Sequence, residues 1–208
     1  MNPRTATARP RALTRIVAPV VALGLLLAGC TGTGDRLADD YRNGTGEGYI
    51  SGDGLIVQPP ADERGEPVEF SGTLEDGTSF SSADVAGDLV VVNFWFAACP
   101  PCREEAEHLQ GVASAYADQG VTFVGVNTGD TDAVARSFAK EHGVEYTSII
   151  DFQDNGVQSA FATSPLPPIS TPTTLVLDAQ GRVAARISGP ISGSSPLDDI
   201  IDELLAES

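Results

Sequence analysis

Cys99 and Cys102 are the residues of this chain whose type and spacing best suit chemistry. Pro100 and Pro101 separate them, the apolar run 89–95 precedes them, and a segment with helical spacing follows. This pattern predicts a buried strand that delivers a dithiol to the N-terminus of a helix. A sulfur there lies near free amides and the positive end of the helix dipole, which favour the nucleophilic thiolate. The pair therefore indicates redox chemistry, with Cys99 as the nucleophile and Cys102 closing or resolving a disulfide.

The N-terminal residues predict export. Residues 1–29 have the pattern of a secretory signal, because four arginines precede an apolar run over 16–28 that contains no acidic residue. The run is too short to span a bilayer and contains Pro19. Residues 27–30, Leu-Ala-Gly-Cys, resemble a bacterial lipobox, so Cys30 is the predicted lipidation site. An ordinary signal peptide with an unrelated cysteine is the alternative. Lipidation would leave the other two of the three cysteines as one pair.

The charge balance narrows the range of partners. The chain has 12 Lys and Arg against 29 Asp and Glu, a net charge of −17. The predicted signal holds four of the basic residues and none of the acidic ones, so cleavage leaves 8 against 29 and a net charge of −21. A strongly acidic surface repels nucleic acid and anionic lipid headgroups, so no nucleic-acid partner is expected. Solubility explains the charge most simply, and a dedicated basic partner is the alternative.

The composition indicates a leader, a tether and one domain. Residues 30–66 are rich in Gly, Asp and small polar residues, which predicts a lipidated cysteine followed by a flexible tether. Two short apolar groups within it, 49–50 and 55–57, could dock on the domain as a short strand. The folded domain is expected over 67–208, and 41% hydrophobic residues suffice for its core.

Within the domain, apolar periodicity and turn signals predict alternating strands and helices. Asp76-Gly77 suggests the turn of an N-terminal β-hairpin. The expected strands are 89–95, 121–126, 146–150, 173–177 and 182–187. The expected helices are 82–85 (one turn), 100–118, 156–161 and 196–205. A further helix, between 121–126 and 146–150, is expected to be capped by Asp130 or Thr131 and to bury Val134, Ala135 and Phe138. A parallel crossover followed by a hairpin and a terminal helix favours one mixed sheet covered on both faces, an α/β class.

Several motifs together resemble the thioredoxin superfamily. They are the run Val-Val-Asn-Phe-Trp, the Cys-Pro-Pro-Cys pair, the strand entry Pro172-Thr173-Thr174-Leu175 and the turn Asp178-Ala179-Gln180-Gly181. The chain is most similar to the membrane-tethered extracytoplasmic branch called TlpA-like or ResA-like, over roughly 67–205. The resemblance implies a thioredoxin-like fold, with a central mixed sheet flanked by helices on both faces and an N-terminal β-hairpin.

The resemblance also implies site residues. Cys99 is expected to attack a disulfide and form a mixed disulfide, which Cys102 then resolves. The Thr171-Pro172 bond is expected to be cis, so that the backbone of Thr171 faces the dithiol and pairs with an extended substrate. Pro168 is a competing candidate for the cis bond. The residues expected to contact substrate are Trp95, Pro100, Pro101, Thr171 and Pro172.

Two positions depart from the family pattern. Ala98 stands where a Trp is common, so a bulky cover over the site is missing or comes from elsewhere. Asn93 stands where cytoplasmic thioredoxins have a buried Asp that accepts a proton. Glu105, one helical turn beyond Cys102, is the expected replacement, and its charge would raise the pKa of the thiols. The alternative is that Glu105 belongs to a solvated face with the neighbouring acidic residues of the first turns.

The expected function is that of a lipoprotein thiol–disulfide oxidoreductase outside the cytoplasmic membrane. By resemblance, it would reduce disulfides in apocytochrome c before haem attachment, with electrons from a membrane donor of the CcdA or DsbD type. The redox-active disulfide itself is expected to suffice, without a metal or another cofactor. An oxidase or isomerase of secreted proteins is the alternative, as is a non-catalytic copper-binding lipoprotein. His108 and His142 are expected to be structural or surface residues, and Phe96 stands where a peroxiredoxin would have Thr.

Overall fold

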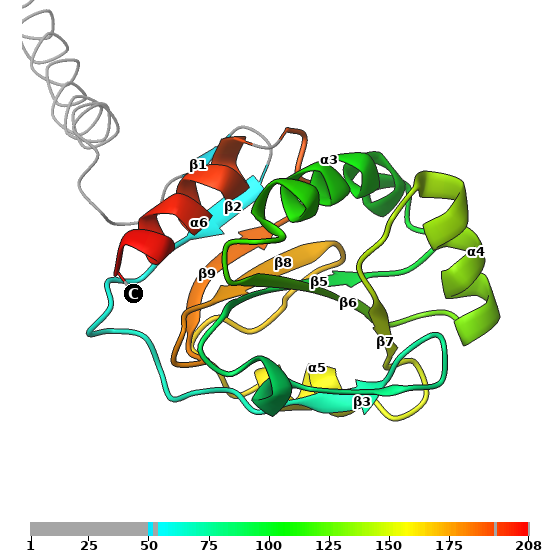
Figure 1. Ribbon diagram of the computed structural model, residues 1–208, viewed down its shortest axis with the longest axis horizontal. Coiled ribbons are helices and arrows are strands. Elements are labelled where there is room, and N and C mark those ends of the chain that lie inside the picture. The colour runs from blue at the N-terminus through cyan, green and yellow to red at the C-terminus, as the bar shows by residue number, and fades with distance from the viewer. Residues whose placement is uncertain (1–49, 52–53, 194, 208) are drawn as a thin grey trace, which may run out of the picture. The chain divides into compact units, whose positions relative to one another are not determined.

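The computed structural model describes residues 50–51, 54–193 and 195–207 (Figure 1). Within them a mixed seven-stranded sheet has the order β1-β2-β9-β8-β5-β6-β7, and a separate hairpin pairs β3 with β4. The strands are β1 (Ile50–Ser51), β2 (Gly54–Val57), β3 (Ser71–Thr73), β4 (Ser79–Ser81), β5 (Leu89–Trp95), β6 (Val121–Asn127), β7 (Ser148–Ile150), β8 (Thr173–Leu177) and β9 (Val183–Ser188). The predicted signal peptide, Cys30 and the first part of the predicted tether lie outside the described residues.

The helices lie where sequence periodicity predicts them. They are η1 (Ser82–Val85), α3 (Pro100–Tyr116), α4 (Asp132–His142), α5 (Gly156–Phe161) and α6 (Ser195–Glu207). Gly143 ends α4 in the left-handed conformation, at φ 69°, which glycine adopts without steric cost. One expectation is wrong: Val134 is 43% exposed, whereas Ala135 and Phe138 are buried. The buried stripe of α4 is centred on Ala135 and Phe138, and Val134 lies beyond its edge.

Strand β5 lies in the interior of the sheet, and all seven of its residues are buried. It pairs in parallel with β6 and antiparallel with β8. A parallel pair needs a crossover, and α3 supplies it. As a consequence, the C-terminal ends of β5 and β6 and the N-terminal end of β8 meet at one edge of the sheet.

Two layers cover the sheet, as Figure 1 shows. Helices α3 and α6 pack on one face through a cluster that includes Leu109, Val112, Ile201 and Leu204. Helix α5 and the β3–β4 hairpin region cover the other face, where Phe70 and Phe161 place their rings 5.2 Å apart. The α/β fold with a mixed sheet between helical layers is therefore confirmed. None of the described helices is long and apolar enough to cross a membrane.

The packed unit begins earlier than the boundary expected at Pro67. Strand β2 pairs with β9, with Ile56 opposite Ile187. It covers backbone groups of β9 that would otherwise lie open at an edge of the sheet. The side chain of Arg64 is 2% exposed and donates to Asp178 at 3.2 Å and to Glu207 at 2.7 Å. Residues 54–66 thus belong to the folded unit, because strand pairing and a buried ion pair compensate for their low apolar content.

Arg64 is expected to contribute more to stability than an exposed arginine. Replacing it by Met leaves the buried Asp178 with fewer partners, so we expect Arg64→Met to lower the free energy of unfolding by about 3 kcal/mol. Arg136, whose side chain is 49% exposed and pairs with Asp132, is the matched control. Arg136→Met should cost less than about 1 kcal/mol. Urea unfolding measures both, and equal losses would contradict the assignment.

Candidate active site

Cys99 is the N-cap of α3, where buried strand β5 turns into the helix. Its backbone is extended, at φ −79° and ψ 111°, and its Sγ accepts the N–H of Cys102 at 3.3 Å. Pro100 and Pro101 occupy the first two helical positions, where their fixed φ suits the helix. Cys99 and Cys102 form a disulfide with their Cα atoms 5.3 Å apart. The strand, the dithiol and the helix thus follow one another as the sequence predicts.

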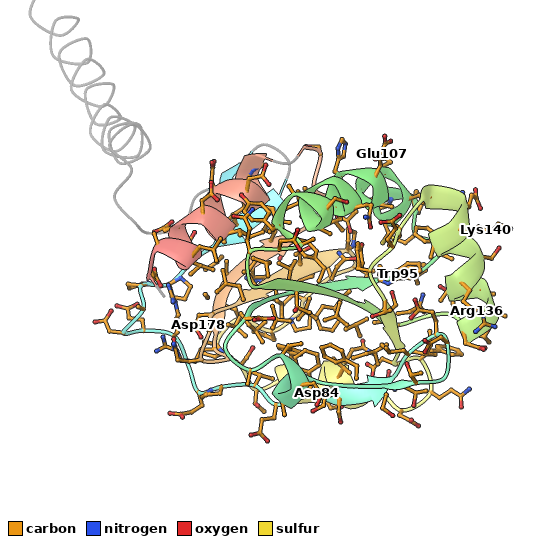
Figure 2. The ribbon with its side chains drawn as sticks, in the orientation of Figure 1. Asp84, Trp95, Glu107, Arg136, Lys140 and Asp178 are labelled. Carbon is orange, nitrogen blue, oxygen red and sulfur yellow. A yellow bond between two sulfur atoms is a disulfide. The ribbon has the colours of Figure 1, made fainter. Side chains whose placement is uncertain are left out.

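The disulfide packs against a cluster of buried apolar side chains. Both cysteines are 2% exposed and pack with Trp95 and with Ala135 and Phe138 of α4. The ring of Trp95 lies 4.4 Å from that of Phe138, and Figure 2 shows Trp95 between the sheet and α4. Trp95 is 6% exposed and forms a wall beside the disulfide, and its contact with substrate stays a prediction.

The rim of the site carries the other expected contact residues. Pro100 is exposed, and Pro101 and Thr171 are half-buried. The cis peptide bond lies between Thr171 and Pro172, which resolves the choice between Pro172 and Pro168. Pro172 itself is buried and directly precedes β8, whose Thr173 pairs with Phe94 at the end of β5. The cis bond and the disulfide therefore lie at the same edge of the sheet.

A cavity of about 380 Å³ adjoins the loop that carries the cis bond. Apolar and polar groups both line it: Phe94, Thr128, Gln158, Ala162 and residues 167–171. Its wall includes Thr171, the residue expected to pair with an extended substrate. The cavity thus offers room for a side chain next to that segment.

Glu105 is buried within the fold and does not belong to a solvated face. Its side chain is 1% exposed, whereas Glu104 and Glu107 are exposed. The amide of Asn93 donates to Oε1 at 2.9 Å, and the backbone N–H of Ile191 donates to Oε2 at 3.0 Å. Burial raises the pKa of Glu105 to about 7, against the lowering effect of these two hydrogen bonds. Asn93, which cannot titrate, therefore orients a carboxyl group that can exchange a proton near neutral pH.

Sequence reasoning missed the role of the loop after β6. Asp130 was a candidate cap of α4, but the N-cap is Thr131. The carboxylate of Asp130 instead accepts the N–H of Ala97 at 2.6 Å, just before the disulfide. No local pattern indicates this contact, because it joins two loops 33 residues apart.

The two histidines lie in different environments. His108 is exposed on α3, and the ring of His142 packs against Phe138 at 4.3 Å. Within the described part of the chain, no group of three or more His, Cys, Asp or Glu side chains could hold a metal ion. The disulfide lies at this edge of the sheet, and the buried Glu105 follows one helical turn beyond Cys102.

A disulfide at the N-terminus of a helix, at the edge of a mixed sheet that also carries a cis-proline, defines a protein of the thioredoxin superfamily. Residues 61–201 match the family described as Redoxin. The chain belongs to this family, on the ResA-like branch of the superfamily.

Named relatives agree with this assignment. The chain is 32% identical over 123 residues to "Thiol-disulfide oxidoreductase ResA" of Bacillus subtilis, a match that covers 58% of this chain and 65% of that protein. It is 34% identical over 128 residues to "Thiol:disulfide interchange protein HelX" of Rhodobacter capsulatus, covering 61% of this chain and 67% of HelX. The matches to the first two ResA proteins thus span just under two thirds of their length, at 65% and 64%.

Solved structures share the fold over almost their whole length. A DsbF homologue from Corynebacterium diphtheriae aligns with a TM-score of 0.63 and 30% identity, covering 75% of this chain and 97% of that one. A secreted thiol-disulfide isomerase from Corynebacterium glutamicum aligns with a TM-score of 0.66 and 27% identity, covering 76% and 96%. The thioredoxin-like assignment thus rests on sequence and on structure.

The raised pKa of Glu105 predicts a pH-dependent stability of the oxidised protein. The pKa is about 7 in the folded state against an ordinary 4.5, so folding favours the protonated form. The stability gained from this preference is complete below pH 4.5 and is lost as the pH rises through 7, by about 3 kcal/mol in all. Urea unfolding at pH 5 and pH 8 should show most of this loss in wild type and not in Glu105→Gln.

Glu104→Gln is the matched control, because Glu104 is the exposed neighbour on the same helix. It should keep the wild-type dependence on pH. A constant offset between wild type and Glu105→Gln at both pH values would show that Glu105 does not titrate in this range.

Proposed function

We propose that the protein is a thiol–disulfide oxidoreductase that acts through Cys99 and Cys102. The observation that carries this proposal is their disulfide at the N-terminus of α3, with Cys99 as the N-cap. In the reduced protein, the Cys99 thiolate attacks one sulfur of a client disulfide, and the other client sulfur leaves as a thiolate and takes up a proton. Cys102 loses its proton and attacks Sγ of Cys99, which releases the second client thiol. Two electrons pass to the client, and the disulfide needs no further cofactor.

We infer that the physiological direction is reduction of the client. Pro100 and Pro101 have no N–H, so the first two helical positions donate nothing to Cys99, and the N–H of Cys102 is the donor found on its sulfur. A less stabilised thiolate makes the disulfide a weaker oxidant. Glu105 supports the same direction, because its ionised form one turn beyond Cys102 disfavours a second negative charge. Its pKa of about 7 also suits it to accept the proton that Cys102 loses.

For client and location, we propose reduction of apocytochrome c outside the cytoplasmic membrane. The protein would be a lipoprotein anchored through Cys30, and a membrane donor of the CcdA or DsbD type would reduce it again. The lipobox-like residues 27–30 and the resemblance to the ResA-like branch support this proposal. The acidic surface supports it as well, since it keeps a tethered domain away from anionic lipid.

A second candidate is isomerisation or oxidation of secreted proteins. The structural relative from Corynebacterium glutamicum, at 27% identity, bears the name of a secreted thiol-disulfide isomerase. Both candidates use the same exchange chemistry and differ in the stability of the reduced dithiol.

The reduction potential of the Cys99–Cys102 couple separates these candidates. We expect a value close to that of thioredoxin, about −270 mV, because few donors stabilise the Cys99 thiolate. Equilibration with dithiothreitol buffers, followed by the fluorescence of Trp95, the one tryptophan of the chain, measures it. A value close to that of DsbA, about −120 mV, would contradict the reductase assignment.

Trapping of the mixed disulfide tests the roles of the two cysteines. In Cys102→Ser, Cys99 can still attack a client, but nothing resolves the product. We therefore expect covalent complexes in export-competent cells, visible by non-reducing electrophoresis and released by dithiothreitol. Cys99→Ser is the control and should trap nothing, since Cys102 lies one turn inside α3, whereas Cys99 is the N-cap. Equal trapping by both variants would disprove the assignment of Cys99 as nucleophile, and recovery of a cytochrome c would support the proposed client.

A further inference from the structure

The peptide of Ala97, two residues before Cys99, is held on both sides by other segments. Its N–H donates to Oδ2 of Asp130 at 2.6 Å. Its carbonyl accepts from Nη1 of Arg103 at 3.3 Å, and Arg103 also pairs with Glu141 of α4 at 3.0 Å. The short turn that joins β5 to α3 thus depends on side chains of α3 and of the β6–α4 loop.

A buried asparagine orients the carboxylate of Asp130. Asn127, at the end of β6, is 0% exposed and donates through Nδ2 to Oδ2 of Asp130 at 2.9 Å. Its own Oδ1 accepts the N–H groups of Gly129 at 3.2 Å and Asp130 at 2.7 Å. One oxygen of Asp130 therefore receives hydrogen bonds from Asn127 and from Ala97, which leaves the carboxylate little freedom to turn.

Asp130 does not act as a helix cap, although it lies only two residues before α4. A capping carboxylate accepts amide N–H groups of the first helical turn. The N-cap of α4 is Thr131, which makes no such side-chain bond, and the carboxylate of Asp130 bonds to Ala97 instead.

The loop that carries Asp130 is in close contact with the segment before the disulfide. The N–H of Thr128 donates to the carbonyl of Trp95 at 3.0 Å. A Cβ on Gly129 would lie 2.9 Å from Cβ of Phe96, so a glycine is needed for this approach. Hydrogen bonds and packing therefore both hold this segment in register with β6.

We propose that Asp130 is a positioning residue for Cys99. Its hydrogen bond to Ala97 holds the turn so that Sγ of Cys99 stays at the N-terminus of α3, within reach of the Cys102 N–H. The role rests on the proposed function, because exchange requires the attacking sulfur in line with the client disulfide. Asp130 itself exchanges no proton, electron or atom in the reaction.

Two substitutions separate the hydrogen bond from the charge. In Asp130→Asn, the amide oxygen can still accept from Ala97 and Asn127, while the charge is absent; Asp130→Ala removes both. We expect the alkylation rate of Cys99 by iodoacetamide in the reduced protein, and kcat for reduction of insulin, to fall about tenfold in Asp130→Ala. Asp130→Asn should restore both rates to within about twofold, with KM for insulin unchanged in either variant.

Asp132→Ala is the matched control. Asp132 is an exposed carboxylate on the same stretch of chain, but it pairs with Arg136 at 2.8 Å. Its removal should leave both rates at the wild-type level. If Asp130→Ala does not fold, Asp130→Ser carries the same expectation, since its hydroxyl is too short to reach Ala97.

Two outcomes would overturn the proposal. Wild-type rates in Asp130→Ala or its Ser substitute would show that the hydrogen bond does not position Cys99. Equally slow rates in Asp130→Asn would assign the effect to charge. If wild type itself fails to reduce insulin, the proposed function fails, but the alkylation rates, which need no client, still decide the role of Asp130.

Discussion

The parallel pairing of β5 with β6 is the constraint on which the site depends. It brings the C-terminal ends of β5 and β6 to one edge of the sheet, and each strand is followed there by a helix. The first exit places the cysteines at the start of α3, and the second supplies the loop that holds the turn before them. Antiparallel β8 begins at the same edge and brings the cis-proline there. The strand order thus brings the two cysteines, the loop that supports them and the expected substrate contact to one edge of the sheet.

The carboxylates of Glu105 and Asp130 make different contacts near the disulfide. Glu105 is enclosed between α3, β5 and the loop before α6, with hydrogen bonds to both oxygens, and burial keeps its pKa near neutral. Asp130 is part-buried and accepts hydrogen bonds from a backbone amide and a buried asparagine. The first can hold or release a proton, and the second holds a peptide. Burial and the partners available decide between these roles, since both residues carry the same functional group.

The direction of electron flow depends on how strongly the site stabilises the Cys99 thiolate. The two prolines after Cys99 remove amide donors, and the nearby acidic group opposes a second negative charge, so both favour a reducing couple. One relative is named a thiol-disulfide oxidoreductase and one structural neighbour a thiol-disulfide isomerase. A few hydrogen bonds around one sulfur are enough to shift the reduction potential of such a couple.

Local patterns determined the strands, the helices, the dithiol at a helix N-terminus and the fold class. These features depend on periodicity, caps and turn residues within short stretches of sequence. The structure departs from the predictions at few points, such as Val134, which is exposed and not buried. Tertiary structure alone decided that Asn93 contacts Glu105, that Asp130 contacts Ala97 and that Arg64 belongs to the folded unit. Each is a contact between segments far apart in the chain, and side-chain hydrogen bonds of this kind have no sequence period. The sequence therefore specified the reactive groups, and the packing of distant elements decided their surroundings.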